Sequence, residues 1–132
     1  MQPIIIKFNI PIGLPCKKRP RVSKYNNVYT PQTKPNLELH KILIEVYYKH
    51  KKKYNFPLHN IYLHIIVYYS KVNKKSPDID NLLKEILDCL ESVNIIKNDR
   101  FIKTVFIKEV ESITKGLIII EIKEHTSEVI NV

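Results

Sequence analysis

The hydrophobic and polar positions along the chain predict four strands. Residues 2–10 are rich in β-forming side chains, and residues 61–69 are β-branched or aromatic almost throughout. The second of these segments is typical of a central strand that is buried on both faces of a sheet. Apolar and polar positions alternate over residues 101–107, and an apolar run at residues 117–122 follows a turn signal at Gly116, so two further strands are expected there.

Two other segments have the helical spacing of apolar positions. From Asn36 to about Lys53 the apolar residues recur three and four positions apart, which predicts an amphipathic helix. They are Leu39, Ile42, Leu43, Val46 and Tyr47. A second helix is expected to begin near Pro77, because proline is favoured in a first helical turn. Its apolar stripe consists of Ile79, Leu82, Leu83, Ile86, Leu87 and Leu90.

The order of these elements, β-α-β-α-β-β, predicts an α+β fold in which two helices pack on one mixed sheet. With 132 residues, the chain is long enough for one hydrophobic core but not for two. The sequence contains neither a repeat nor a linker. We therefore expect a single domain over residues 1–132.

The charged side chains are strongly biased towards cations. Lys and Arg number 22 against 13 Asp and Glu, which gives a formal net charge of +9. An excess of this size on a small domain favours polyanionic partners, above all nucleic acid. An AT-rich genome would also raise the lysine content, but it would not explain the arginines that cluster near the N-terminus.

Cysteine usage and apolar run length indicate the compartment. Cys16 and Cys89 are far apart, which fits neither a zinc ribbon nor a disulfide scaffold and suits a reducing environment. The first residues show no signal-peptide pattern, and no apolar run approaches the length that spans a bilayer. We expect an intracellular protein, cytoplasmic or nucleoid-associated, that is not secreted and has no membrane partner.

Residues 11–35 hold five of the eight prolines and are expected to form a long loop. A loop of this length in a small domain is usually functional or disordered. It holds a run of cationic residues and then two aromatic residues, a combination that suits phosphate contact and base stacking. These residues are Lys17, Lys18, Arg19, Arg21, Tyr25 and Tyr29. A solvated turn or a localisation signal is the alternative, although residues 28–31 have the character of a short strand.

Two carboxylates, Asp78 and Asp80, stand at the expected start of the second helix. Carboxylate oxygens are ligands that Mg²⁺ prefers, and the positive end of a helix dipole stabilises anions. One further carboxylate would complete a metal site for phosphodiester hydrolysis, in which the metal activates a water. Asp99, in the turn after the helix, is the best candidate. Simple helix capping is the alternative function of the pair.

Lys84 follows Asp80 by one helical turn and lies on the same face. Its ammonium group can stabilise charge in a phosphoryl transition state, position a water or contact a phosphate. The structural alternative is a pair of salt bridges from Lys84 to Asp80 and to Asp88. Taken together with Asn81 and Asp99 on a basic chain, these residues favour a nuclease site.

Longer motifs surround these residues. They are Arg19-Pro20-Arg21, Tyr29-Thr30-Pro31, Pro77-Asp78-Ile79-Asp80-Asn81-Leu82-Leu83-Lys84, Leu87-Asp88-x-Leu90 and Asn98-Asp99-x-x-Ile102. In these motifs, from about residue 17 to residue 108, the chain resembles the RusA family of Holliday junction resolvases. The resemblance implies a Mg²⁺-dependent homodimeric endonuclease that binds four-way DNA junctions and nicks symmetrically related strands. Mn²⁺ is a plausible substitute metal.

The resemblance also implies roles for individual residues. The catalytic and metal-binding aspartates would be Asp78, Asp80 and Asp99, and the catalytic lysine would be Lys84. Asp88 also matches a family position, and we interpret it as support for the lysine or for the helix face.

One departure from the family pattern concerns DNA contact. Ser76 and Pro77 stand where some members have arginines, so Lys74 and Lys75 are expected to supply these contacts instead. Two other functions remain open on the sequence. One is a DNA-binding protein without catalysis, and the other is a nuclease for other branched DNA or RNA.

Overall fold

The computed structural model describes residues 1–29 and 32–131. Its elements in chain order are β1 (Ile4–Asn9), β2 (Arg21–Val22), β3 (Val28–Tyr29), α1 (Lys34–Tyr54), β4 (Leu63–Tyr69), α2 (Ile79–Ser92), the 3₁₀ turn η1 (Asp99–Phe101), β5 (Ile102–Glu109) and β6 (Leu117–Glu124). The four main strands and both helices confirm the predicted α+β fold, with small shifts at their boundaries.

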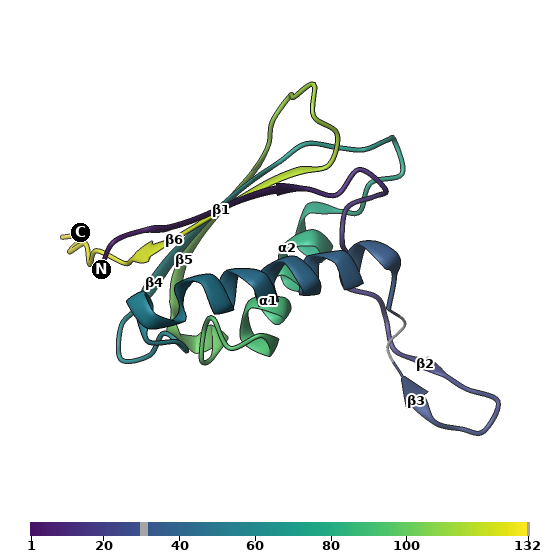
Figure 1. Cartoon of the computed structure of the whole chain (residues 1–132), viewed down its shortest axis with the longest axis horizontal. Coiled ribbons are helices and arrows are strands. Elements are labelled where there is room, and N and C mark those ends of the chain that lie inside the picture. Colours follow the sequence, from purple (N-terminus) through teal and green to yellow (C-terminus); the bar gives the residue numbers. More distant parts are fainter. Residues whose placement is uncertain (30–31, 132) are drawn as a thin grey trace.

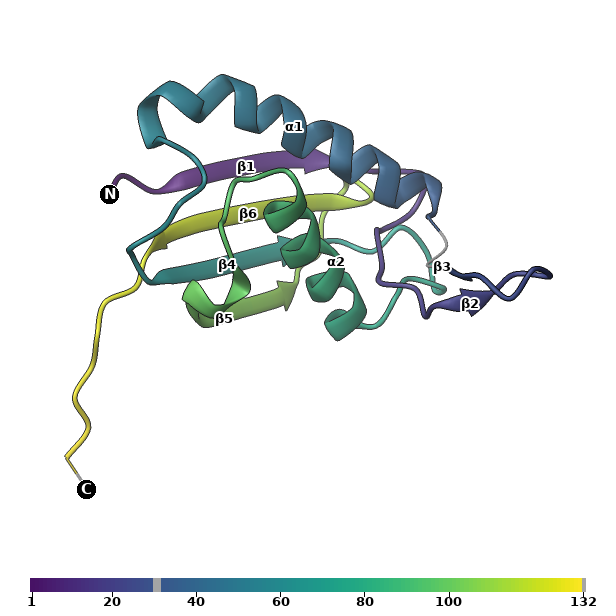
Figure 2. The ribbon, with the colours of Figure 1, turned by 90° about the horizontal axis from the view of Figure 1, so that it is seen from below.

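Four strands form one mixed sheet in the order β1-β6-β4-β5 (Figure 2). β4 pairs with β5 in parallel and with β6 antiparallel, and β1 pairs antiparallel with β6. Parallel neighbours need a crossover connection, which α2 supplies between β4 and β5. β5 and β6 are consecutive in sequence but not neighbours in the sheet, since β4 lies between them.

Gly116 closes the connection between β5 and β6 at a positive φ of 69°. The backbone N–H of Ile10 donates to the Gly116 carbonyl over 2.8 Å, which ties this connection to the end of β1. A Cβ atom at Gly116 would come within 2.2 Å of the Ile10 carbonyl oxygen. The turn signal in the sequence therefore marks a position where only glycine fits.

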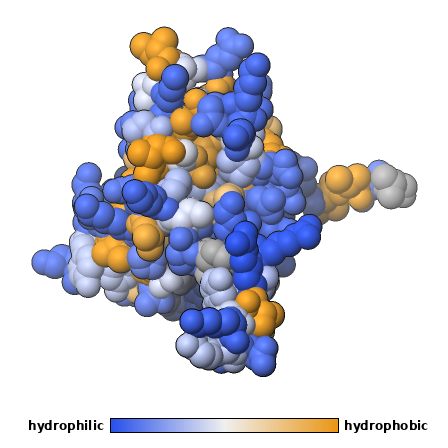
Figure 3. Space-filling view, turned by 90° about the vertical axis from the view of Figure 1, so that its right-hand side faces the viewer, coloured by the Kyte–Doolittle hydropathy of each residue, from blue (hydrophilic) through white to orange (hydrophobic). Residues whose placement is uncertain are grey.

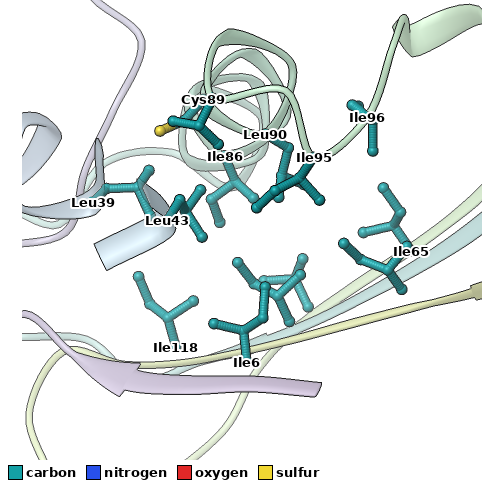
Figure 4. Packing of buried hydrophobic residues seen from close by; sticks show 14 of the residues in the cluster. Ile6, Leu39, Leu43, Ile65, Ile86, Cys89, Leu90, Ile95, Ile96 and Ile118 are labelled. Atoms are coloured by element: carbon teal, nitrogen blue, oxygen red, sulfur yellow. The ribbon is translucent and has the colours of Figure 1, made fainter. Parts of the chain in front are cut away.

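Both helices cover the same face of the sheet (Figure 1). Leu39 and Leu43 of α1 and Leu90 of α2 are fully buried against the sheet strands (Figure 4). Along β4 (Leu63–Tyr69), buried positions alternate with half-buried ones. The prediction that this strand is buried on both faces is therefore wrong, because none of the described helices covers the second face of the sheet.

The apolar stripe predicted for α2 is confirmed at Leu82, Ile86 and Leu90, which are buried. Ile79 was expected in the same stripe but is 43% exposed, because it lies in the first turn, beyond the edge of the core. Cys89 completes the buried face. Of the described helices, none is both long and apolar enough to cross a membrane.

A small hairpin interrupts the segment that was expected to be a loop. β2 pairs antiparallel with β3 through Arg21↔Tyr29 and Val22↔Val28. The hairpin extends away from the two-layered body of the molecule (Figure 1). The short strand expected at residues 28–31 is thus present at Val28–Tyr29, while Thr30 and Pro31 lie outside the described residues.

Candidate functional site

A cleft of about 650 Å³ lies between the segment that follows β1 and the start of α2. Among the residues that line it are Lys17, Lys18, Arg19, Arg21, Lys75, Asp78 and Asn81. Five of the six residues predicted to bind DNA therefore lie beside one of the predicted metal ligands. Lys74 is exposed but does not line the cleft. Figure 3 views the molecule from this side, and hydrophilic side chains cover much of it.

Asp78 is the N-cap residue of α2, with extended backbone angles of φ −60° and ψ 151°. Its carbonyl accepts a hydrogen bond from the N–H of Leu82 over 3.0 Å. Its side chain, however, accepts no capping hydrogen bond from the described residues. The capping alternative therefore does not account for this carboxylate, which is exposed at the rim of a cationic cleft and can bind a cation there.

Asp80 and Lys84 form an ion pair on the outer face of α2. Lys84 Nζ lies 3.9 Å from Asp80 Oδ2, and both side chains are 64% exposed. Exposed pairs of this kind contribute little to stability, because water screens the charges and ordering the side chains costs entropy. The pair can therefore separate when a ligand binds either member.

Asp88 contacts the basic segment and not Lys84, which corrects the second salt bridge considered for this lysine. Lys17 Nζ donates to Asp88 Oδ2 over 2.6 Å. This hydrogen bond is the main reason that the pKa of Lys17 is raised above its ordinary value, although partial desolvation of the ammonium group acts to lower the pKa. The backbone N–H of Lys17 also donates to the carbonyl of Asn81 over 2.9 Å. Asp88 and Asn81 thus hold the basic segment against α2.

Asn36, at the start of α1, holds the same segment from the other side. Its amide group accepts from the N–H of Cys16 and donates to the carbonyl of Cys16, each over 2.9 Å. Asn36 is 3% exposed, one of two buried polar residues in the described chain. No sequence motif singles out Asn36, because a buried asparagine is recognised only by what it contacts.

Asp99 lies at the other end of the sheet from Asp78. The parallel register pairs Leu63 with Ile102 and Tyr69 with Glu109. Asp78 follows the end of β4, whereas Asp99 precedes the start of β5, so the length of α2 separates them. No group of three or more His, Cys, Asp or Glu side chains within residues 1–29 and 32–131 is arranged to hold a metal ion. One chain therefore does not bring Asp99 to the Asp78–Asp80 pair.

The sequence is similar to that of a known protein family. The family described as "Endodeoxyribonuclease RusA" matches residues 11–123, which is most of the chain. The chain belongs to the RusA family. This membership identifies it as an endodeoxyribonuclease-family protein and supports nuclease activity. No curated protein matches the sequence.

The RusA match spans the elements that build the cleft. It includes the basic segment after β1, α1 with Asn36, and α2 with the aspartate pair. It also includes η1, which carries Asp99. The family match and the geometry thus agree on which part of the molecule carries the site.

Proposed function

We propose that this RusA-family protein is a Mg²⁺-dependent endonuclease that resolves four-way DNA junctions by paired nicking and acts as a homodimer. The observation that carries the proposal is the cleft in which Asp78 lies among cationic side chains. Cations in a groove bind the phosphates of DNA. A carboxylate in the same groove repels phosphate unless a divalent cation lies between them.

The donor atoms at the start of α2 fit a hard cation. Asp78 and Asp80 offer carboxylate oxygens two residues apart, and both side chains are exposed to water. Mg²⁺ commonly binds through one or two carboxylates and keeps several waters, and Mn²⁺ accepts the same oxygen ligands. When bound, the metal supplies charge neutralisation at the scissile phosphate and lowers the pKa of an attacking water.

The cationic side chains have a separate task. Lys18, Arg19 and Arg21 line the cleft and are expected to fix the DNA backbone in register. Lys75 lines its opposite wall, and Lys74 is expected to contact a neighbouring phosphate outside it. Lys17 lines the cleft as well, although its ammonium group also pairs with Asp88.

Lys84 is expected to stabilise the negative charge that develops on the phosphate during hydrolysis. Its ammonium group lies 3.9 Å from the Asp80 carboxylate, one helical turn from the proposed metal site. A cation in this position stabilises the transition state more than the ground state, because the charge on the reacting phosphate increases.

The uncovered face of the sheet supports the homodimer. Ile66 pairs with Phe106 in register, and Tyr68 pairs with Ile119, so these side chains share one face. Ile5 lies on the same face and is 65% exposed, and Phe106 is 46% exposed. We call these five residues the open sheet face. Lys7 and Glu121 lie on this face as well, because Lys7 pairs with Ile119 and Glu121 pairs with both Ile5 and Ile66. A face that carries exposed apolar side chains together with both signs of charge can pair with a second copy of itself across a twofold axis, so a second copy is the partner that fits it.

A dimer also offers a position for Asp99. In one chain Asp99 lies at the far end of the sheet from the aspartate pair. When the strands of the two copies run antiparallel across the interface, a twofold axis places the start of β5 in one copy near the end of the sheet that carries the aspartate pair in the other copy. We therefore assign the third carboxylate of each site to Asp99 of a second copy.

Asp80→Asn tests the proposed function. It removes a metal ligand and one negative charge while preserving the shape of the side chain. We expect cleavage of a synthetic four-way junction in Mg²⁺ to fall by at least about a hundredfold, because the metal supplies both the nucleophile and charge neutralisation. Binding of the junction should persist or tighten, because repulsion from phosphate is reduced.

Glu91→Gln is the matched control for this experiment. It also removes one negative charge, but from the other end of the same helix. The comparison therefore shows whether the effect on cleavage depends on the position of the lost charge or only on the change in net charge. Cleavage by Asp80→Asn equal to that of the parent would refute the metal site and favour a DNA-binding protein. Equal rates on flaps, linear duplex or structured RNA would favour a nuclease for other nucleic acids.

A further inference from the structure

The β2–β3 hairpin presents an aromatic side chain at a fixed position outside the cleft. Its two strands leave the body side by side and end in a turn that carries Lys24 and Tyr25 (Figures 1 and 2). Tyr25 is 73% exposed. The Lys24 ammonium lies 5.1 Å from the centre of the Tyr25 ring, so a cation and an aromatic ring stand together at the tip.

The turn is held by hydrogen bonds within the hairpin. The Ser23 hydroxyl accepts from the N–H of Tyr25 over 3.2 Å and from the N–H of Asn27 over 3.1 Å. The N–H of Ser23 donates to the Asn27 carbonyl over 2.8 Å. Asn26 adopts the left-handed conformation, with φ at 62°, which asparagine tolerates well. These bonds fix the backbone at Tyr25, so little further ordering is needed when its ring binds a partner.

The hairpin is continuous with the cleft. Arg21, the first residue of β2, lines the cleft, while Tyr25 lies four residues further along the chain, in the turn. At about 3.3 Å per fully extended residue, the Tyr25 backbone lies less than roughly 13 Å from Arg21. Bases in one DNA strand are spaced about 3.4 Å apart. The Tyr25 ring is therefore close enough to contact a base within a few positions of the phosphate that contacts Arg21.

We propose that the hairpin is a DNA-binding arm whose Tyr25 ring stacks on an unpaired or unstacked base at the branch point. This inference rests on the proposed function and deepens it, because it assigns the recognition of branched DNA to a named side chain. Every base has a π face, but a regular duplex covers that face on both sides. Only a base that has left its stack, as at a branch point, can receive the ring.

The charge around the hairpin favours DNA as the partner. Lys18, Arg19 and Arg21 precede the turn and Lys24 lies within it. Val22 and Val28 are 64% and 72% exposed, and they pair on the same short ribbon. These apolar side chains would also suit a second protein copy, but such a contact would bring two clusters of positive charge together. A two-stranded ribbon of this kind fits a DNA groove.

Tyr25→Ala tests the inference, with binding measured in the Asp80→Asn background so that the readout does not depend on cleavage. We expect affinity for a four-way junction to fall roughly 5- to 150-fold, the range for loss of one base–aromatic stack. Affinity for linear duplex should change less than twofold. Tyr25→Phe keeps the ring and should bind the junction like the parent.

Tyr48→Ala is the matched control. Tyr48 is also exposed and also has a lysine over its ring, but it lies towards the end of α1 away from the cleft. Tyr48→Ala should therefore bind the junction like the parent.

A second experiment uses junctions with abasic sites near the branch point. Tyr25→Ala should not weaken binding to these junctions any further, because the base on which the ring stacks is already missing. Equal loss on junction and duplex, no loss on the junction, or a loss of dimer mass in Tyr25→Ala would each overturn the inference. None of these results bears on cleavage by the parent.

Discussion

Asn36 determines at the residue scale where the cationic side chains of the cleft lie. A segment with many prolines and cationic residues has few backbone partners of its own, so without an anchor it would remain disordered. The Asn36 amide pairs with both backbone groups of Cys16, one residue before Lys17. The side chain of Asp78, in contrast to that of Asn36, makes no capping hydrogen bond among the described residues and lines the cleft.

Asn36→Ala should weaken both stability and junction binding. Removal of the amide leaves two backbone groups of Cys16 unpaired, which costs about 1–3 kcal/mol of the free energy of unfolding, measured by urea denaturation. Junction affinity, measured where the variant is still folded, should fall about tenfold, because DNA must then order the segment.

Ser70→Ala is the control for this substitution. Ser70 is equally buried and also clamps a loop, since its hydroxyl donates to the Thr114 carbonyl over 2.7 Å. It should lose similar stability and keep its junction affinity. A parallel loss of affinity in both variants would show that Asn36 acts only through overall stability.

At the scale of the elements, the sheet divides the molecule into a helix-covered side, which carries the candidate site, and an open side. α2 crosses from β4 to β5 on one face, and its polar surface carries Asp80, Lys84 and Asp88. The helical period predicted that these three residues share a face. It could not predict that Asp88 would pair with Lys17, since that contact depends on where a distant loop returns to the helix.

Phe106→Glu should disrupt the dimer, because it replaces an exposed aromatic ring of the open sheet face with a charge and does not disturb the helix-covered core. By sedimentation, the parent should have about twice the 15.6 kDa mass of one chain. The variant should sediment as a single chain and should not nick junctions, because no second copy supplies Asp99 to its site. Ile113→Glu adds the same charge at a fully exposed isoleucine and should leave the mass unchanged. A parent that sediments near 15.6 kDa under assay conditions would contradict the homodimer.

On the scale of the whole molecule, the two ends of the sheet carry different parts of the proposed site. The parallel pairing of β4 and β5 requires α2 to run the length of the sheet, which separates Asp99 from the aspartate pair in one chain. In the proposed homodimer, two copies complete each site, and each dimer has two such sites. This arrangement matches the symmetry of a four-way junction, whose paired strands are related by a twofold axis.

Mixing Asp80→Asn with Asp99→Asn after subunit exchange tests this arrangement. Each homodimer should be inactive. A mixed dimer has one site in which both substitutions meet and one site with neither, so roughly a quarter of all sites should be active. Denaturing gels should then show singly nicked junctions. No recovery of nicking on mixing would place Asp99 with the pair of its own chain, or outside the site.

The sequence by itself determined the elements of this protein, its fold class and the charged residues that line the cleft. Hydrophobic period and local charge depend on near neighbours, which a sequence displays directly. Only the tertiary structure decided that the second face of β4 is open, that Asn36 clamps Cys16, and that Asp99 lies far from Asp78. These facts depend on strand order and on contacts between distant segments, which arise when the whole chain minimises its exposed apolar surface and pairs its buried polar groups.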